Sequence, residues 1–266
     1  PRKITSETMW SHGIPSQELI DSAKKILDEP LSEAIVEKTI SAEDAAHTLQ
    51  ASLTHMGLNK WLVEVTPEMN AKMMVKSSEK RVYVRDGALF APESIKRLLV
   101  HEIGTHVFRY INGEKQNFKF LRMGLIGYLP TEEGLATFHE KQFGVQDKST
   151  LRRYALRVLA ANNVLSAGFY EVFSNLARFT NDHDDLFDIV KRAKRGFCDT
   201  KQWGGHLKDQ VYLKGFLQVT DHLSKYKEDY PYLMTGKVSL NMLPQLKVLA
   251  DSNLLVMPEF LPEHLI

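Results

Sequence analysis

The chain has 266 residues, and its 34 basic and 33 acidic residues leave a formal net charge of +1. A chain without a basic excess is not expected to be a general nucleic-acid binder, and no uninterrupted apolar run is long enough to cross a bilayer. The single cysteine, Cys198, excludes an internal disulfide and fits a reducing compartment. We therefore expect a cytoplasmic protein with neither nucleic acid nor membrane among its partners. Because the chain starts at Pro1 rather than at a methionine, we also expect that a longer N-terminus has been removed.

Helix and strand patterns predict one catalytic domain over residues 1–266, built from three consecutive segments. Residues 1–58 have apolar positions at helical spacing, and residues 59–145 contain short strands followed by two helices. Residues 146–266 have an almost wholly helical pattern. This order predicts an α+β fold with a small antiparallel or mixed sheet and a largely helical C-terminal lobe. We expect the functional site in a cleft between the strand-bearing part and this lobe.

Three strands are predicted in the middle of the chain, at residues 61–65, 72–76 and 81–85. The last alternates strictly between apolar and polar residues and runs into the turn pair Asp86-Gly87. The simplest arrangement is a meander. We expect the 81–85 strand at an edge, where a substrate peptide could add as a further strand.

The next element is a helix that is predicted to begin at Pro92 and to stop at Asn112-Gly113. Proline fits the first turn of a helix, and Glu93 favours the positive end of the helix dipole. Apolar residues then recur at helical spacing at Ile95, Leu98, Leu99, Ile103, Val107 and Ile111. The segment therefore reads as an amphipathic helix with one buried face.

Two imidazoles and a carboxylate fall within six residues of this helix, in the segment His-Glu-Ile-Gly-Thr-His from His101 to His106. Imidazole nitrogens bind zinc, and a neighbouring glutamate, here Glu102, can take a proton from a zinc-bound water. In the familiar motif the histidines are four residues apart, whereas five positions on a regular helix place the rings ~140° apart. A shared metal ion therefore requires a π-bulge, which Gly104 would permit. The alternative is two unrelated histidines near a helix core.

A second helix is predicted after Pro130, with Thr131 as its N-cap and Gly144 as its terminator. A zinc ion held by two histidines needs a third protein ligand, and a carboxylate on a following helix is one established solution. We choose Glu133, with the adjacent Glu132 as the alternative. Both could instead be ordinary acidic residues of a first turn. The small residues of Gly-Leu-Ala at 134–136 would let this helix pack closely against the histidine helix.

Several segments together resemble one known family. The segments are residues 101–106, 112–113, 127–136, 195–196 and 204–215. Their motifs and order closely resemble a metallopeptidase family that includes the microtubule-associated tyrosine carboxypeptidases and bacterial relatives called QEGLA-motif proteins. Here Glu132 stands where that bacterial name has a glutamine. The resemblance spans roughly residues 10–225, and it is specific to the family rather than to one member of it.

The resemblance implies a zincin-like α+β domain with one zinc ion. By the matching positions its ligands would be His101, His106 and Glu133, and Glu102 would be the general base. The eukaryotic members of the family remove the C-terminal tyrosine of α-tubulin. The implied partner is therefore a protein C-terminal tail such as that of α-tubulin on microtubules. A eukaryotic source would then make association with the cytoskeleton an expectation as well.

Further residues are expected to act on the substrate. The developing oxyanion needs a second donor, for which Tyr212 leads because it matches the family segment, and His206 is the alternative. Tyr212 could equally be a core tyrosine whose hydroxyl is tied to the backbone. A carboxypeptidase must also recognise a free carboxylate, and Lys208 and Arg195 are candidates, with His206 beside them.

Three functions remain open at this stage. The first is a zinc carboxypeptidase that prefers tyrosine. The second is a zinc endopeptidase or aminopeptidase on the same scaffold, and the third is a non-catalytic binding module. A basic carboxylate-binding group near the metal would favour the first, and an acidic amine-binding group would favour an aminopeptidase. The intact set of His101, Glu102, His106 and Glu133 argues against the third.

Overall fold

Two compact units are each built from segments that lie far apart in the sequence. The computed structural model describes residues 2–30, 37–69, 71–125 and 127–265. Unit 1 comprises Pro1–Ser32 and Asp147–Gln218, and unit 2 comprises Glu33–Gln146 and Val219–Ile266. The fold is α+β, as predicted: helices dominate, and the strands form one small mixed sheet.

The two units cut across the three consecutive segments that the sequence suggested. Residues 219–266 do not belong to the same unit as 147–218, because they pack with the sheet and the histidine helix. The predicted helical lobe is therefore divided between the units. Part of the predicted N-terminal helical region, residues 31–36, lies outside the described residues. That residues 1–266 act as one catalytic domain remains a prediction.

The sheet of unit 2 has three strands, β1 (Leu62–Thr66), β2 (Met73–Lys76) and β3 (Arg81–Arg85), in the order β1-β3-β2. β3 pairs with β1 in parallel and with β2 antiparallel, so the predicted meander is wrong. β3 is central, so its predicted place at an edge is wrong as well. The short turn η1 (Ser77–Glu79), followed by Lys80 at φ 53°, folds β2 and β3 into a hairpin. β1 pairs on the other side of β3.

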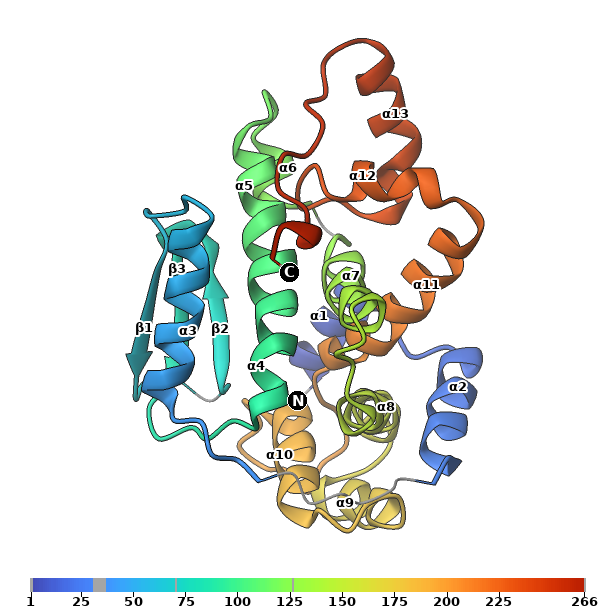
Figure 1. Cartoon of the computed structure of the whole chain (residues 1–266). Coiled ribbons are helices and arrows are strands. Elements are labelled where there is room, and N and C mark those ends of the chain that lie inside the picture. The colour runs from blue at the N-terminus through green and yellow to red at the C-terminus, as the bar shows by residue number, and fades with distance from the viewer. Residues whose placement is uncertain (1, 31–36, 70, 126, 266) are drawn as a thin grey trace. The chain divides into compact units, whose positions relative to one another are not determined.

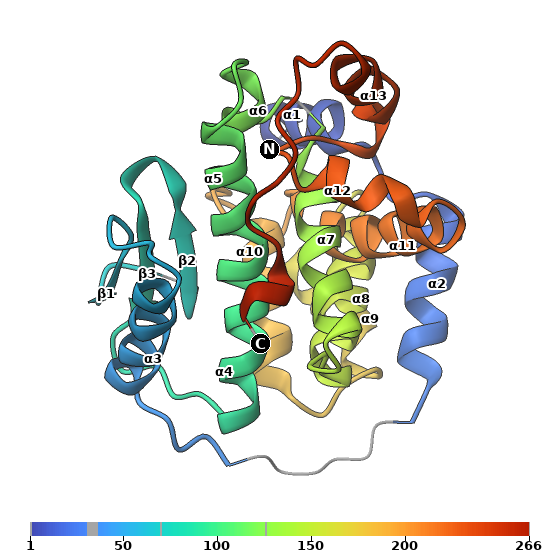
Figure 2. The same cartoon turned by 45° about the horizontal axis from the view of Figure 1, so that its top comes forward.

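One face of this sheet is covered by α3 (Ala42–His55), which begins where the Ser41 side chain accepts a hydrogen bond from the Asp44 backbone. Its apolar side is fully buried against the strands through Leu49 and Leu53. The Gln50 side chain also bonds the backbone of β1 and of the residue before it. This packing leaves β2 as the strand beside the histidine helix (Figures 1 and 2).

The histidine helix is continuous from α4 (Pro92–Leu98) through η2 (Leu99–Val107) to α5 (Phe108–Glu114). η2 is a π-helix of nine residues that contains the whole His-Glu-Ile-Gly-Thr-His segment. The bulge that the sequence predicted at this position is therefore confirmed, and it is extended into more than one π-helical turn.

Gly104 was predicted to permit the bulge through its flexible backbone, but the structure gives it a different role. It is not among the described residues with positive φ, so the π-helix does not depend on a glycine-only backbone there. Its missing side chain instead makes room for the C-terminal segment η6 (Pro262–Leu265). A Cβ at this position would stand 2.9 Å from Leu265 Cδ1 and 3.4 Å from Pro262 Cβ.

The pair Asn112-Gly113 does not stop the helix, which continues to Glu114. Asn112 is buried, and its amide donates to the carbonyls of Met234 and Phe260 while its oxygen accepts from the backbone of Glu259 and Phe260. Because these bonds satisfy the side chain, it does not compete for the helix backbone. Asn112 therefore holds the backbone at Glu259 and Phe260 against the histidine helix.

The glutamate helix α7 (Leu129–Gln142) packs along η2 (Figure 2). It begins two residues before Thr131, whose hydroxyl accepts a hydrogen bond from the Leu240 backbone, so Thr131 is not the N-cap. Gly144 follows the helix at φ 65° and ends it as predicted. Gly134, Leu135 and Ala136 are buried on α7, in agreement with close packing of the two helices. The remaining elements of unit 2 are α6 (Phe120–Met123), η4 (Lys227–Asp229), α12 (Tyr230–Leu233), η5 (Leu240–Met242) and α13 (Leu243–Asp251).

Unit 1 is helical in its described residues. Its elements are α1 (Arg2–His12), α2 (Gln17–Asp28), α8 (Lys148–Asn163), α9 (Phe169–Ala177), α10 (His183–Lys194), η3 (Lys208–Gln210) and the first half of α11 (Val211–Lys225). α2 lies against α8, and their buried apolar faces form a core separate from that of unit 2. Across the part of the chain that the structure describes, no helix combines the length and apolar character needed to cross a bilayer.

Replacing Gly104 by valine should destabilise unit 2 by about 1–3 kcal/mol, because the added methyl groups displace η6. Gly104→Ala is the matched control. Its Cβ meets the mobile end of Leu265, and alanine gains about 1 kcal/mol of helix propensity over glycine. Urea unfolding of both variants checks this. A valine variant as stable as the alanine variant would show that η6 does not depend on this contact.

Candidate metal centre

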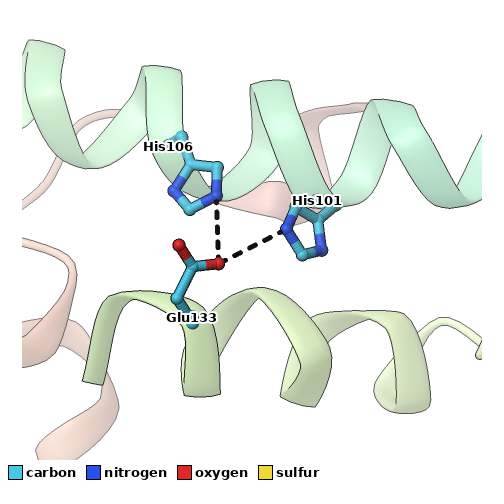
Figure 3. Close-up of side chains that lie close together, drawn as sticks. All are labelled: His101, His106 and Glu133. Atoms are coloured by element: carbon cyan, nitrogen blue, oxygen red, sulfur yellow. Dashed lines mark ion pairs between the residues drawn. The ribbon is translucent and has the colours of Figure 1, made fainter. Parts of the chain in front are cut away.

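Three side chains from two helices converge on one point in unit 2 (Figure 3). His101 and His106 come from η2, and Glu133 comes from α7. Glu133 Oε2 lies 3.8 Å from His101 Nε2 and 3.8 Å from His106 Nε2. One ligand atom from each of the three residues can be chosen so that all lie within 4.8 Å of one another. The structure therefore contains a possible metal-binding triad.

The π-helix makes this convergence possible. Hydrogen bonds between residues five apart place such residues on one face, whereas a regular α-helix would turn the two rings ~140° apart. The ring centroids are instead 5.1 Å apart. Two ligand atoms on a tetrahedral zinc ion are separated by about 3.3 Å, so each 3.8 Å distance from Glu133 Oε2 to a histidine Nε2 is about half an ångström too long. The donor set of two imidazoles and one carboxylate also suits zinc.

The other ring nitrogen of each histidine is held by a buried carboxylate. Glu140 Oε1 lies 2.8 Å from His101 Nδ1, and Glu132 Oε1 lies 2.8 Å from His106 Nδ1. A carboxylate at Nδ1 keeps the proton on that nitrogen and leaves the Nε2 lone pair free for a metal ion. The adjacent glutamates of α7 therefore have different roles. Glu133 faces the Nε2 atoms, and Glu132, the alternative ligand of the sequence analysis, orients His106.

Two arginines hold these carboxylates in turn. Arg109 is fully buried and donates to Glu132 Oε2, to Leu233 O at 3.0 Å and to Val238 O at 2.7 Å. Arg97 donates to Glu140 Oε1 at 3.0 Å. Burial by itself would raise the pKa of Glu132, but the charge of Arg109 and the hydrogen bond with His106 lower it to about 2. Glu132 is therefore ionised at neutral pH.

The site is rich in negative charge. Burial lowers the pKa of His101, but the nearby Glu133 carboxylate and the hydrogen-bonded Glu140 carboxylate outweigh burial and raise the pKa well above its usual value. For His106, too, the carboxylates outweigh burial and raise the pKa. Four carboxylates act on the two rings: Glu102, Glu132, Glu133 and Glu140. A bound cation would balance this charge.

Glu102 and Tyr128 complete the described surroundings. Glu102 is half-buried on η2, is not one of the three converging residues, and acts on both histidines through its charge. Tyr128 precedes α7, and burial together with the charges of Glu132 and Glu133 raises its pKa to about 12. Its hydroxyl therefore stays protonated as a donor within electrostatic reach of Glu133. No local pattern around Tyr128 predicts a role for it, although it lies inside a family-like segment.

The other predicted site residues, Tyr212, His206, Lys208 and Arg195, belong to unit 1. The Tyr212 ring stacks on Tyr154 at 4.9 Å, and the Arg157 guanidinium lies 4.9 Å from the Tyr212 centroid. Lys208 and His206 are half-buried, and Arg195 is exposed. Their roles in catalysis remain predictions.

The same region of unit 1 collects positive charge around one buried carboxylate. Asp209 accepts from Arg192 Nε at 2.8 Å and Nη2 at 3.1 Å. Burial raises the pKa of Asp209, but the bonds from Arg192 and the charges of Arg157 and Arg195 outweigh it and lower the pKa. His206 has a lowered pKa through burial and the charge of Arg195. This region therefore suits an anionic group.

Replacing Arg109 by methionine should destabilise the protein by about 3–5 kcal/mol, because it leaves Glu132 buried without its cation. The double variant Arg109→Met/Glu132→Gln removes that unpaired charge and should recover part of the loss. Urea unfolding of the metal-free proteins measures both. If Arg109→Met unfolds at the wild-type midpoint, the buried pair is not needed for the fold.

Asp209 should make stability depend on pH. Its pKa is lower in the folded than in the unfolded chain, so its contribution is complete above the unfolded value and is lost as the pH falls through the folded value. From about pH 5 downward, the free energy of unfolding should fall more steeply for the wild type than for Asp209→Asn. The matched control is Asp188→Asn, at an exposed carboxylate of unit 1. Parallel pH profiles for the wild type and Asp209→Asn would contradict this.

Comparison with known proteins relates the whole site region to one family. The family model for microtubule-associated tyrosine carboxypeptidase matches residues 11–266. MATCAP2 of Homo sapiens is 37% identical over 177 residues, covering 64% of this chain and 33% of the relative. Microtubule-associated tyrosine carboxypeptidase 1 of Mus musculus is 37% identical over 158 residues, covering 58% of this chain and 33% of the relative.

The chain thus aligns with only about a third of the length of these relatives. The family model nevertheless extends over nearly all of the chain, including both helices of the metal triad and the cationic region of unit 1. The chain belongs to the microtubule-associated tyrosine carboxypeptidase family.

Proposed function

We propose that this chain is the catalytic part of a zinc carboxypeptidase that hydrolyses the last peptide bond of a protein. The observation that carries the proposal is the triad of His101, His106 and Glu133, with both Nδ1 atoms held by carboxylates so that both Nε2 atoms face Glu133. A merely structural histidine pair has no need of this orientation. The histidine helix beside the edge strand β2 also supports a zincin-like fold.

Glu102 is the proposed general base. When bound by the three ligands, zinc supplies a Lewis acid that polarises a peptide carbonyl and lowers the pKa of water. Glu102 would accept the proton of the attacking water and pass it to the leaving nitrogen. Its place on η2 between the two histidines supports this role.

The residues of unit 1 are proposed to act on the substrate. Tyr212 would donate to the developing oxyanion, with His206 as the alternative donor. Lys208, Arg195 and His206 would bind the free carboxylate of the substrate. The support for this is the concentration of positive charge in that region, which lowers the pKa of His206 and of Asp209.

The peptide backbone is proposed to add to the sheet at β2. β3 is central and cannot accept another strand, whereas β2 pairs with β3 on one side only among the described strands and lies beside η2. An extended peptide along β2 would gain main-chain hydrogen bonds there. This replaces the edge that was expected at Arg81–Arg85.

The proposed substrate is a protein tail that ends in tyrosine, and the α-tubulin tail is the leading candidate. This rests on the names of the relatives, which describe tyrosine carboxypeptidases associated with microtubules. A cytoplasmic location at the cytoskeleton would agree with that substrate.

Glu102→Gln should still bind one zinc ion per chain but lose about 10²–10⁴-fold in peptide hydrolysis, because the base is gone while the ligands remain. Metal analysis measures the first property. Mass spectrometry of a peptide library with varied C-terminal residues measures the second, and loss of single terminal residues, tyrosine first, is expected. The matched control is Glu93→Gln, at an exposed glutamate on the same helix, which should keep both properties.

Two results would contradict the proposal. Wild-type rates in Glu102→Gln would exclude this residue as the base. Cuts at internal bonds without loss of terminal residues would exclude a carboxypeptidase and favour an endopeptidase.

A further inference from the structure

Another buried histidine, His139, lies on the same helix as Glu133 and is not part of the triad. His139 on α7 is 1% exposed and has a partner at each ring nitrogen. Thr105 Oγ1 lies 2.7 Å from His139 Nδ1, and the Tyr230 hydroxyl lies 3.1 Å from His139 Nε2. The sequence left His139 without a role, because it stands six residues after Glu133 rather than at a ligand spacing.

This hydrogen-bond chain can run in one direction from the Tyr230 hydroxyl to the Val100 carbonyl. In that direction the Thr105 hydroxyl donates its one proton to the Val100 carbonyl at 3.2 Å and accepts from His139 Nδ1 at 2.7 Å. His139 therefore donates from Nδ1, and its Nε2 accepts from the Tyr230 hydroxyl. A neutral imidazole is required for this, and burial together with nearby positive charge lowers the pKa of His139 to about 3.

This chain of hydrogen bonds ends at the backbone carbonyl of Val100, next to the first of the two metal-ligating histidines. Val100 directly precedes His101, and Thr105 directly precedes His106. The bond from the Thr105 side chain to the Val100 carbonyl thus spans five residues, the same interval that separates the ligands. π-helical turns are rare and tend to occur at functional sites, so this one is expected to need interactions that favour it over the α-helical alternative. In that alternative the two Nε2 atoms could not share an ion.

We propose that Thr105, His139 and Tyr230 are positioning residues, whose hydrogen-bond chain holds the π-turn at the spacing that the metal ion requires. The inference rests on the proposed function, because it concerns the metal centre of that function. It links the centre to α12, since Tyr230 is the first residue of that helix. The Tyr230 ring also packs edge-on against His139, with centroids 5.6 Å apart, and so fixes the imidazole plane.

Thr105→Val tests the proposal with little change of shape, because valine replaces the hydroxyl with a methyl group. We expect the dissociation constant of zinc, measured by competition with a chromophoric chelator, to rise about 10–100-fold. Thr105→Ser restores the hydroxyl and should stay near the wild-type value. Tyr230→Phe removes only the outer donor and should weaken zinc binding in the same direction, by a smaller factor.

A control separates positioning from general loss of stability. Thr235 is fully buried in the same unit, and its hydroxyl donates to Tyr232 O at 2.7 Å rather than to the backbone of η2. Thr235→Val should lower the unfolding midpoint of the metal-free protein while it leaves zinc affinity unchanged. Thr105→Val should weaken zinc binding far more than Thr235→Val does, even where the two variants lower the unfolding midpoint by the same amount.

The outcomes distinguish the two proposals. A folded Thr105→Val protein with wild-type zinc affinity overturns the positioning role, whatever its activity. Reduced affinity in Thr105→Val and Tyr230→Phe, with rescue in Thr105→Ser, supports it. If the wild type binds zinc tightly but releases no C-terminal residue from any peptide, the proposed function fails and the positioning role stands. A wild type that takes up no zinc overturns both.

Discussion

The widening of one helix by a single residue per turn is the constraint on which the rest of the structure depends. His101 and His106 can present their Nε2 atoms to one point only if η2 is π-helical. The surroundings of η2 agree with that requirement. α7 supplies Glu133 opposite the two rings, and η6 fits over the side of η2 where Gly104 has no side chain. The site is therefore a property of several packed elements rather than of one motif.

The need to balance buried charge explains the residues that surround the triad. Two imidazoles oriented by Glu132 and Glu140 require those buried carboxylates to be stabilised, and Arg109 and Arg97 do so. Arg109 also needs acceptors for its remaining donors, and it finds them in the carbonyls of Leu233 and Val238. This is a physical reason why residues 219–266 belong to the unit that holds the triad, although 72 intervening residues, 147–218, belong to the other unit.

The two units contribute different chemistry. Unit 2 contains the triad, Glu102 and the strand β2, which is paired on one side only among the described strands, and these are the parts that the proposed hydrolytic centre needs. Unit 1 contains the stacked tyrosines and the cations around Asp209, which suit an anionic peptide end. Membership of the tyrosine carboxypeptidase family makes this division of labour a coherent proposal.

The sequence by itself determined the family, the α+β class, and the histidine helix with its bulge, and it predicted Glu133 as the third residue of the possible triad. The bulge follows from local spacing, because the interval of five between two histidines has one helical solution that lets them share an ion. Only the tertiary structure decided the order of the strands, the division of the C-terminal helices between two units, and the roles of Glu140, Arg109 and His139. The roles of the buried side chains arise from contacts between residues far apart in the chain, such as Arg109 with Glu132, 23 positions away, and with Val238, 129 positions away. No local pattern records such contacts, since a buried histidine bonded to a threonine and a tyrosine looks in sequence like any other histidine.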